Sequence, residues 1–384
     1  MHVFPFWRLA GYYFFYFAFI GAFSPYFGLY LQSLNFSAWD IGLVMSQMQL
    51  MRLLGPNLWG WLADRGQRRT VIVRLAGVIS LAGFSSFFWL RELGGMLVAM
   101  AVLAFFWSAA LPLVETLTFD HLRGLRGDYS RVRLWGSIGF IGAVMAAGAV
   151  LDRVPAAGIL WVCWAILLGI LGLALSLPEA PPHRDEVVAP PILDLLRQPK
   201  VAALFSACFA MSAAHGALYV FYSIHLAGHG YSKTEVGGLW SLGVVAEILV
   251  FAAMSRIAAR YSLRNLLIVS FAAAVLRFAL IGWWVSSPVL TVLAQLMHGL
   301  TFGLYHAAAI AAVNRWFPGR AQARGQALYS SISFGAGGLL GGLISGWTWE
   351  GVGAAWTYGL SSLFALVGLI CVLRWVVDDK PSGA

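Results

Sequence analysis

The chain has 384 residues, of which 60% are hydrophobic and only 11% are Asp, Glu, Lys or Arg. Soluble domains are about 45–50% apolar and about 25% charged, so this composition excludes an ordinary soluble enzyme or binding domain. The net charge of +9 does not indicate a nucleic-acid partner, because the basic residues are interspersed among apolar runs of about 20 residues, the length that crosses a bilayer as a helix.

The apolar runs predict an all-α polytopic membrane protein with twelve transmembrane helices. Their expected ranges are 10–33, 40–62, 70–91, 95–119, 134–152, 156–178, 201–227, 234–257, 265–286, 289–313, 325–347 and 353–376. Basic residues gather in the loops on one side, which the positive-inside rule assigns to the cytoplasm. With an even number of spans, both termini are expected in the cytoplasm, and the expected location is the plasma membrane, as the inner membrane of a bacterium.

Two charges of opposite sign interrupt consecutive apolar runs, Glu115 in the fourth and Arg133 at the start of the fifth. A charged side chain at membrane depth costs roughly 2.5 to 3.5 kcal/mol even on the lenient insertion scale, so it is expected to face a cavity or a partner and marks a candidate functional site. Helices joined by a short loop are neighbours. We therefore expect Glu115 and Arg133 to meet and neutralise each other until a substrate or a proton intervenes, with a purely structural ion pair as the alternative.

A segment rich in proline and charge separates the sixth span from the seventh. It predicts an N-terminal six-helix half at 1–178, a cytoplasmic linker at 179–200 and a C-terminal six-helix half at 201–384. The halves resemble each other in sequence at an offset of 195 residues, which pairs Gly21 with Gly216. Parallel repeats of this kind are the architecture of major facilitator transporters, whose substrate site lies at midplane between the halves. The sequence therefore predicts the major facilitator fold, built from two six-helix pseudo-repeats.

The segment GWLADRGQRR, which begins at Gly60, resembles the signature that follows the second helix of the major facilitator superfamily, with its second glycine one residue early. We expect its charged residues to form a gating or packing contact at the cytoplasmic helix ends and not a substrate site. These residues are Asp64, Arg65, Arg68 and Arg69.

Within that superfamily the chain resembles the lactose permease family, on the segment FYFAFIGAFSPYF and on the spacing from Glu115 to Arg133. The resemblance implies that these two charges bind the substrate. It adds Ser137 as a small contact residue and Phe140 as a stacking ring.

The same resemblance implies a proton-coupling set in the C-terminal half. It comprises Glu247, Arg277 and His298, and Glu115 is a further candidate to carry the proton. The acid that the family has three residues after the histidine is Thr301 here, so the sugar-permease mechanism cannot be carried over whole. A structural role in helix packing is the alternative for each of these residues.

A closer resemblance is to the phenylpropionate permease branch, on YSRVRLWGS, on GYSKTEVGGLWSLGVVAEI and on Arg52 in the second span. It implies a small aromatic carboxylate as substrate. The offset of 195 residues makes Arg52 equivalent to Glu247, so we expect Arg52 to bind the carboxylate, for which a guanidinium fork is suited. Glu247 would pair with Arg52 in the empty site and take up the proton when the substrate anion replaces Glu247 as the partner of Arg52. The alternative is a permanent Arg52–Glu247 ion pair that holds the two halves together. Tyr219 and Tyr222 are candidates to stack on an aromatic ligand.

These observations predict a proton-coupled symporter that imports a small aromatic carboxylate by alternating access, with a sugar or nucleoside symporter as the alternative. A membrane enzyme is less favoured, since no H-E-x-x-H or G-x-S-x-G segment occurs. A non-transporting membrane receptor of the same fold is also a less favoured alternative. The three cysteines lack metal-ligand spacing and no G-x-x-x-x-G-K-[ST] loop is present. We expect no metal and no cofactor, and a monomer whose partners are the substrate, protons and the bilayer.

Overall fold

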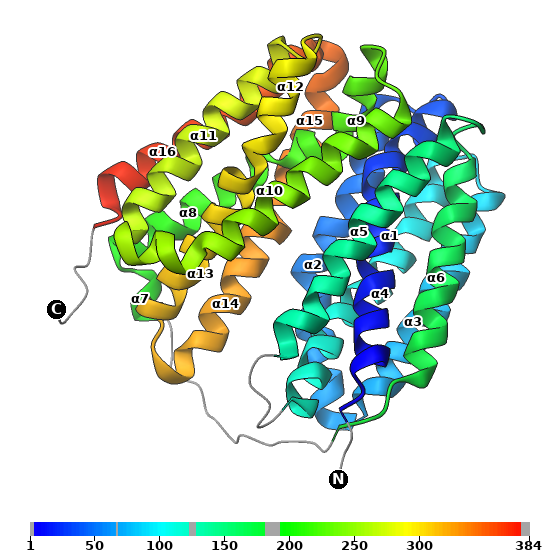
Figure 1. The fold of residues 1–384 in the computed structure, drawn as a ribbon, viewed down its shortest axis with the longest axis horizontal. Helices are drawn as coiled ribbons and strands as arrows, with labels where there is room; N and C mark the ends of the chain where they lie inside the picture. Colours follow the sequence, from blue (N-terminus) through cyan, green and yellow to red (C-terminus); the bar gives the residue numbers. More distant parts are fainter. Residues whose placement is uncertain (1–3, 67, 123–127, 181–192, 378–384) are drawn as a thin grey trace. The chain divides into compact units, whose positions relative to one another are not determined.

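A computed structural model describes residues 4–66, 68–122, 128–180 and 193–377, and these residues form helices without any strand (Figure 1). Eleven helical segments in this part of the chain have the length and hydropathy to cross a membrane. The helix α2 is as long but more polar, because it carries side chains such as Gln47 and Arg52. The predicted all-α polytopic fold class is thereby confirmed.

The first compact unit comprises residues 1–185 together with 230–241. Within it α1 is the most buried helix and packs along α5 and α6, while α3 and α4 pack on each other. Its helices are α1 Phe6–Ser33, α2 Ala38–Gly66, α3 Arg69–Ser85, η1 Ser86–Phe88, α4 Leu93–His121, α5 Asp128–Leu151 and α6 Gly158–Ser176.

Glycines let α1 and α5 approach each other so closely that the backbone of one helix contacts the backbone of the other. A Cβ atom added to Gly21 would lie 2.5 Å from the Phe140 carbonyl oxygen, and one added to Gly139 would lie 2.1 Å from that of Phe14. Small residues at helix interfaces are the usual means of close packing in membranes. The α1–α5 pair is therefore a rigid frame for the side chains that α5 presents.

The second compact unit comprises residues 186–229 and 242–384. In it α16 packs on α8 and α11, and α9 packs on α15. Its helices are α7 Leu193–Leu196, α8 Pro199–Ala214, α9 Gly216–Gly228, α11 Leu263–Trp283, α12 Pro288–Leu296, η2 Gly299–Leu304, α13 Tyr305–Trp316, η3 Gly319–Ala321, α14 Gln322–Ser330, η4 Ser331–Gly337, α15 Gly338–Gly351, α16 Gly353–Trp375 and most of α10 Lys233–Arg260. The expected division at 178 and 201 stays a prediction.

Three spans of the second unit are less regular than expected. The expected helix 201–227 is interrupted at His215, where a Cβ added to the next residue, Gly216, would lie 2.1 Å from the Gly341 carbonyl carbon. The tenth and eleventh spans each contain a π-helical segment, η2 and η4. Such segments occur often at functional sites, and no hydrophobic periodicity signals them.

The first turn of α10 belongs to the first unit and is capped there by Asp152, which follows α5. The carboxylate accepts hydrogen bonds from the Lys233 N–H at 2.7 Å, the Thr234 N–H at 3.0 Å and the Thr234 hydroxyl at 2.6 Å. The Tyr26 hydroxyl donates to the Lys233 carbonyl at 2.8 Å. The two bonds from backbone N–H groups satisfy donors that a helix N-terminus otherwise leaves unpaired.

Candidate functional site

The two charges that interrupt the apolar runs lie within the helices of the first unit. Glu115 is on α4 and Arg133 on α5, and both side chains are half-buried. Membrane-embedded charges of this kind face a bundle interior or a water-filled cavity and mark substrate or proton pathways.

The Arg133 side chain is held against α1 by an aromatic ring and a glycine. Its guanidinium carbon lies 3.9 Å from the centroid of the Phe17 ring, which is a cation–π contact. A Cβ added to Gly136 would lie 2.9 Å from Arg133 Nη1 and 2.6 Å from Phe17 Cδ2. A larger residue at this position would displace the guanidinium, so Gly136 makes the contact possible.

Glu115 lies within the electrostatic influence of Arg133. One turn further along α4 the Phe119 ring is stacked on that of Tyr129 from α5, with centroids 4.6 Å apart and planes 22° from parallel. Among the described residues no ion pair within 4 Å joins Glu115 to Arg133, although the two charges influence each other electrostatically. Their mutual neutralisation stays a prediction.

Aromatic side chains and a third charge complete this group. The ring of Tyr16 is stacked on that of Trp107, with centroids 4.3 Å apart and planes 9° from parallel. Tyr16 lies within the electrostatic influence of Arg52, Glu115 and Arg133. The Arg52 side chain is exposed, and its Nη1 donates to Gln49 Oε1 at 3.5 Å. Arg52 and the two predicted charges therefore all act on Tyr16, a buried residue of the first unit.

The other predicted substrate-binding residues are distributed over both units. Ser137 and Phe140 are half-buried on α5, where the Phe140 backbone forms the close contact with α1. Tyr219 and Tyr222 are on α9 in the second unit, half-buried and fully buried respectively. Their expected meeting in one site stays a prediction.

The second unit contains a buried polar cluster centred on Arg277, whose side chain is 0% exposed. Its Nε donates to the Ala294 carbonyl at 2.9 Å, and its Nη1 donates to Thr301 Oγ1 at 2.8 Å and lies 3.4 Å from His215 Nε2. Its Nη2 donates to Gln295 Oε1 at 3.2 Å. All these partners are neutral acceptors, and Thr301 stands where the lactose permease resemblance led us to look for an acid.

Two of the predicted proton-coupling residues are neighbours of this cluster. His298 Nε2 lies 3.8 Å from Glu247 Oε2, and the His298 ring is stacked on Phe302 at 5.3 Å. The His298 Nδ1 atom is buried and has no hydrogen-bond partner in the described part of the chain. The separation corresponds to an ion pair only when His298 is protonated. The predicted proton-coupling roles and the predicted pairing of Glu247 with Arg52 stay predictions.

Comparison with known proteins identifies the family of this chain. A profile of the MFS_1 like family matches residues 6–360. The chain belongs to the MFS_1 like family. It is therefore an integral membrane protein of the major facilitator transporters and not an enzyme.

Three relatives show the extent of the similarity. A "Probable 3-phenylpropionic acid transporter" of Escherichia coli (strain K12) is 29% identical over 372 residues, which is 94% of this chain and 96% of the relative. The maltose permease of Geobacillus stearothermophilus is 27% identical over 376 residues, 97% of this chain and 94% of the relative. The crystal structure of the nucleoside transporter NupG matches with a TM-score of 0.81 at 20% identity, over 96% of this chain and 98% of that one. The predicted major facilitator fold and family resemblance are confirmed.

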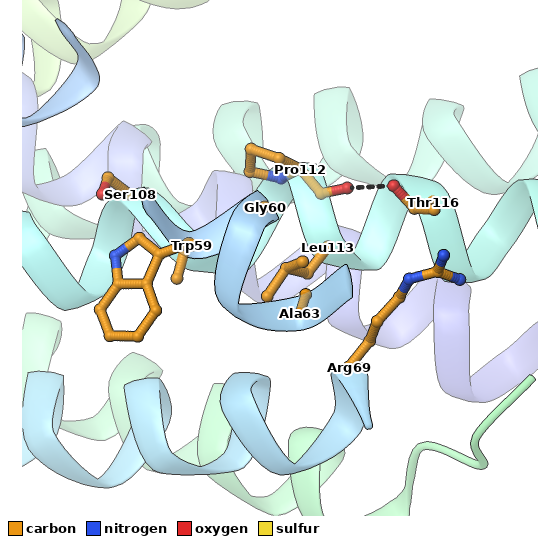
Figure 2. A pocket seen from close by; sticks show the side chains of 9 residues that line it. Trp59, Gly60, Ala63, Arg69, Ser108, Pro112, Leu113 and Thr116 are labelled. Carbon is orange, nitrogen blue, oxygen red and sulfur yellow. Dashed lines mark hydrogen bonds between the residues drawn. The ribbon is translucent and has the colours of Figure 1, made fainter. Parts of the chain in front are cut away.

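The signature segment of this major facilitator transporter lies beside a small cavity between α2 and α4. Figure 2 shows its lining, with Trp59 from α2, Thr116 from α4 and Arg69 from the start of α3. The cavity holds about 100 Å³, whereas ligand pockets usually measure roughly 300–1,000 Å³. It is too small for an organic substrate of that size.

The signature residues make separate contacts in the transporter. Arg69 forms an ion pair with Asp120 on α4, Arg65 lies 4.2 Å above the Trp61 ring, and Arg68 is exposed just before α3. The side chain of Asp64 lies outside the described residues. A gating role for the four residues stays a prediction.

Sequence reasoning missed the aromatic residues that lie one helical turn from the two charges of the transporter, and one residue that caps a helix. Tyr129 is one helical turn before Arg133, and Phe119 is one turn after Glu115, so helical spacing could have brought both forward. Glu179, which caps α3 by accepting from the Thr70 N–H at 3.0 Å, had no sequence signal.

Proposed function

We propose that this transporter is a proton-coupled symporter that imports a small aromatic carboxylate by alternating access. The observation that carries the proposal is the half-buried Arg133 guanidinium, which rests on the Phe17 ring and has no carboxylate within 4 Å among the described residues. A guanidinium presents parallel N–H donors that match the two oxygens of a carboxylate. The carboxylate of an anionic substrate would bind to these donors directly.

Two further observations support an aromatic substrate. The three charges act on Tyr16, whose buried ring is stacked on that of Trp107, and aromatic residues near the charges favour a ligand ring in stacked or edge-on contact. A relative that is 29% identical over nearly the whole chain carries the name of a probable 3-phenylpropionic acid transporter. Arg52, with its charge near the same rings, is proposed as a second contact for the carboxylate.

Proton coupling is proposed from the polar cluster of the second unit. Glu247 Oε2 and His298 Nε2 lie 3.8 Å apart, and the buried His298 Nδ1 has no hydrogen-bond partner among the described residues. Arg277 supports this site through neutral hydrogen bonds, and Glu115 is the alternative proton carrier. A monocarboxylate that enters with one proton moves no net charge, so a pH gradient would drive it at about 1.4 kcal/mol per pH unit.

A sugar or nucleoside symporter is the second candidate. It is favoured by the maltose permease, which is 27% identical over 97% of this chain, and by the fold shared with NupG. A neutral substrate that enters with one proton carries charge and gains about 2.3 kcal/mol per 100 mV of membrane potential. The two candidates therefore differ in their electrical signature.

The test is transport by the purified protein in proteoliposomes. We expect an acid exterior at zero potential to drive accumulation of 3-phenylpropionate, and a potential at equal pH to drive none, because the symport is electroneutral. Arg133→Gln should abolish uptake, while maltose and uridine should not compete. Accumulation of either neutral compound, or substrate-induced current at fixed pH, would contradict the aromatic-carboxylate function.

We also propose that the protein resides in a bacterial inner membrane as a monomer with both termini in the cytoplasm. The excess of Arg in the loops after the second, fourth, eighth and tenth spans supports this orientation. The signature residues Asp64, Arg65, Arg68 and Arg69 are then proposed to act at the cytoplasmic gate. Reporter fusions at the C-terminus test the orientation.

A further inference from the structure

The C-terminal end of α6 receives two guanidinium groups from the helices that pack on it, α1 and α3 (Figure 1). Arg8 on α1 donates from Nη1 to the Ser176 carbonyl at 3.1 Å. Arg74 on α3 donates from Nε to the Ala174 carbonyl at 3.3 Å and from Nη2 to the Leu177 carbonyl at 3.0 Å. These acceptors lie within one helical turn, so the two guanidinium groups are neighbours. We propose that Arg8 and Arg74 form a binding site for the phosphate group of an anionic phospholipid.

The carbonyl groups at the end of α6 do not neutralise these two positive charges. A helix C-terminus carries about half of one negative charge. Among the described residues no carboxylate lies within 4 Å of either guanidinium. The acid that follows α6, Glu179, serves the start of α3 instead, where its carboxylate accepts hydrogen bonds from the N–H groups of Arg69 at 3.2 Å and Thr70 at 3.0 Å. An excess of positive charge therefore stays at this end of α6.

Both guanidinium groups have further donors for a ligand. A guanidinium carries five N–H donors, and the bonds to α6 use one N–H of Arg8 and two of Arg74. Arg8 is exposed and Arg74 is half-buried, so neither group is enclosed by protein. The planar arrangement of these donors suits the oxygens of a phosphate group. An anion bound here would gain charge-assisted hydrogen bonds without displacing the contacts to α6.

The surface around this end of α6 favours a lipid over a soluble phosphate, because it is apolar and exposed. On α3 the side chains of Val71, Leu75 and Val78 follow one face at helical spacing, and each is about half exposed. Leu175 on α6 is 58% exposed, and Trp7 on α1 is 71% exposed. Tryptophan is enriched at the level of the lipid headgroups, and basic pockets between transmembrane helices bind anionic headgroups. A ligand with an anionic head and acyl chains matches both parts of this surface.

Arg153 provides a matched control in the same unit. It is exposed just after α5, and its Nη1 donates to the Ala149 carbonyl in the last turn of that helix at 2.7 Å. Arg153→Gln therefore removes the same charge and the same kind of bond from a different helix end. A general attraction of the basic protein for anionic lipid would appear in this variant as well.

The first experiment measures lipid binding to the detergent-purified protein by native mass spectrometry, with phosphatidylglycerol as the anionic probe and phosphatidylcholine as the zwitterionic one. We expect one phosphatidylglycerol to bind more tightly than phosphatidylcholine. Arg8→Gln and Arg74→Gln should each weaken phosphatidylglycerol binding about fivefold, and the double variant about 25-fold, at about 1 kcal/mol for each basic residue. Arg153→Gln should leave binding unchanged. Equal binding of the two lipids, a double variant that keeps the preference, or an equal loss in Arg153→Gln would overturn the proposal.

The second experiment separates lipid binding from the structural contact of Arg74 with α6. Melting temperatures are measured for each variant in both lipids, and the difference between the lipids is compared, because this difference does not depend on the stability of the variant itself. Phosphatidylglycerol should raise the melting temperature of the unmodified protein above its value in phosphatidylcholine, and the double variant should lose this difference. Arg74→Lys keeps the charge without the paired bonds to the carbonyl groups, so it should melt lower in both lipids and retain part of the difference. A lysine variant that loses as much of the difference as Arg74→Gln would refute a site based on charge.

A competition experiment distinguishes the lipid from a free anion. Inorganic phosphate at millimolar concentration should not displace phosphatidylglycerol, because it lacks the acyl chains that contact the apolar surface. Displacement would make this a site for a soluble anion and refute the lipid assignment. None of these measurements involves a transported substrate, so their outcome is independent of the proposed function. Only the assignment of the site to the cytoplasmic leaflet rests on the proposed orientation.

Discussion

Asp152 offers a quantitative test of the contacts that hold the first turn of α10. Asp152→Ala removes the acceptor for the Lys233 N–H and for the N–H and hydroxyl of Thr234. Loss of an N-cap costs typically about 1 kcal/mol, and the carboxylate charge near a helix N-terminus adds roughly 0.3–1 kcal/mol when exposed. Because Asp152 is exposed and solvent screens its charge, we expect about 1 kcal/mol for the alanine variant and about half of that for Asp152→Asn.

The assay is the melting temperature of the detergent-solubilised protein. A domain of this size shifts by about 2–4 °C per kcal/mol, so we expect a decrease of about 2–4 °C for Asp152→Ala and about 1–2 °C for Asp152→Asn. Asp194→Asn is the control, because the side chain of Asp194 is 90% exposed and pairs loosely with Arg197 at 3.8 Å. An alanine variant that melts with the unmodified protein would refute a stabilising cap.

The pH dependence of the same measurement has a definite sign. The hydrogen bond from the Thr234 hydroxyl, followed by those from the backbone N–H groups, holds the pKa of Asp152 below its usual value. A carboxyl with a lowered folded-state pKa stabilises the protein above its unfolded pKa of about 3.9 and loses that contribution as the pH falls through the folded value. The gap between the unmodified protein and Asp152→Asn should be constant from about pH 5 to 7 and narrow below about pH 4. A gap that widens in acid would contradict this account.

Three further changes test packing, recognition and coupling. Gly139→Ala should lower the melting temperature, since its Cβ would lie 2.1 Å from the Phe14 carbonyl oxygen and overpacking costs roughly 1–3 kcal/mol. Gly142→Ala is the control and should leave the melting temperature unchanged, because a Cβ added there meets no atom within 4 Å. Equal decreases for the two variants would refute the backbone contact at Gly139. Arg52→Gln should weaken binding of carboxylates far more than of an uncharged analogue, and equal losses would remove its carboxylate role. Glu247→Gln should keep binding and exchange but lose proton-driven accumulation; if accumulation survives, another residue carries the proton.

Local properties of the sequence were sufficient for the fold and the family. Hydropathy along the chain specifies the membrane spans, because each helix must bury its own backbone groups in lipid whatever its neighbours are. The repeat pairs Gly21 with Gly216, and the structure shows that each lies at a close backbone contact within its own unit. The same local logic singled out Glu115 and Arg133 as charges that hydrocarbon does not tolerate without a role.

The contact that holds Arg133 was decided by the tertiary structure alone. The position of the Arg133 guanidinium depends on the rotamer of Phe17 and on the space at Gly136, and these follow from the packing of α1 against α5. Hydrophobic periodicity contains no such information, because it specifies which face of a helix is buried and not which atoms meet there. The sequence by itself therefore determined that two charges lie within the helices of the first unit, while the three-dimensional packing determined that the Arg133 guanidinium rests on the Phe17 ring.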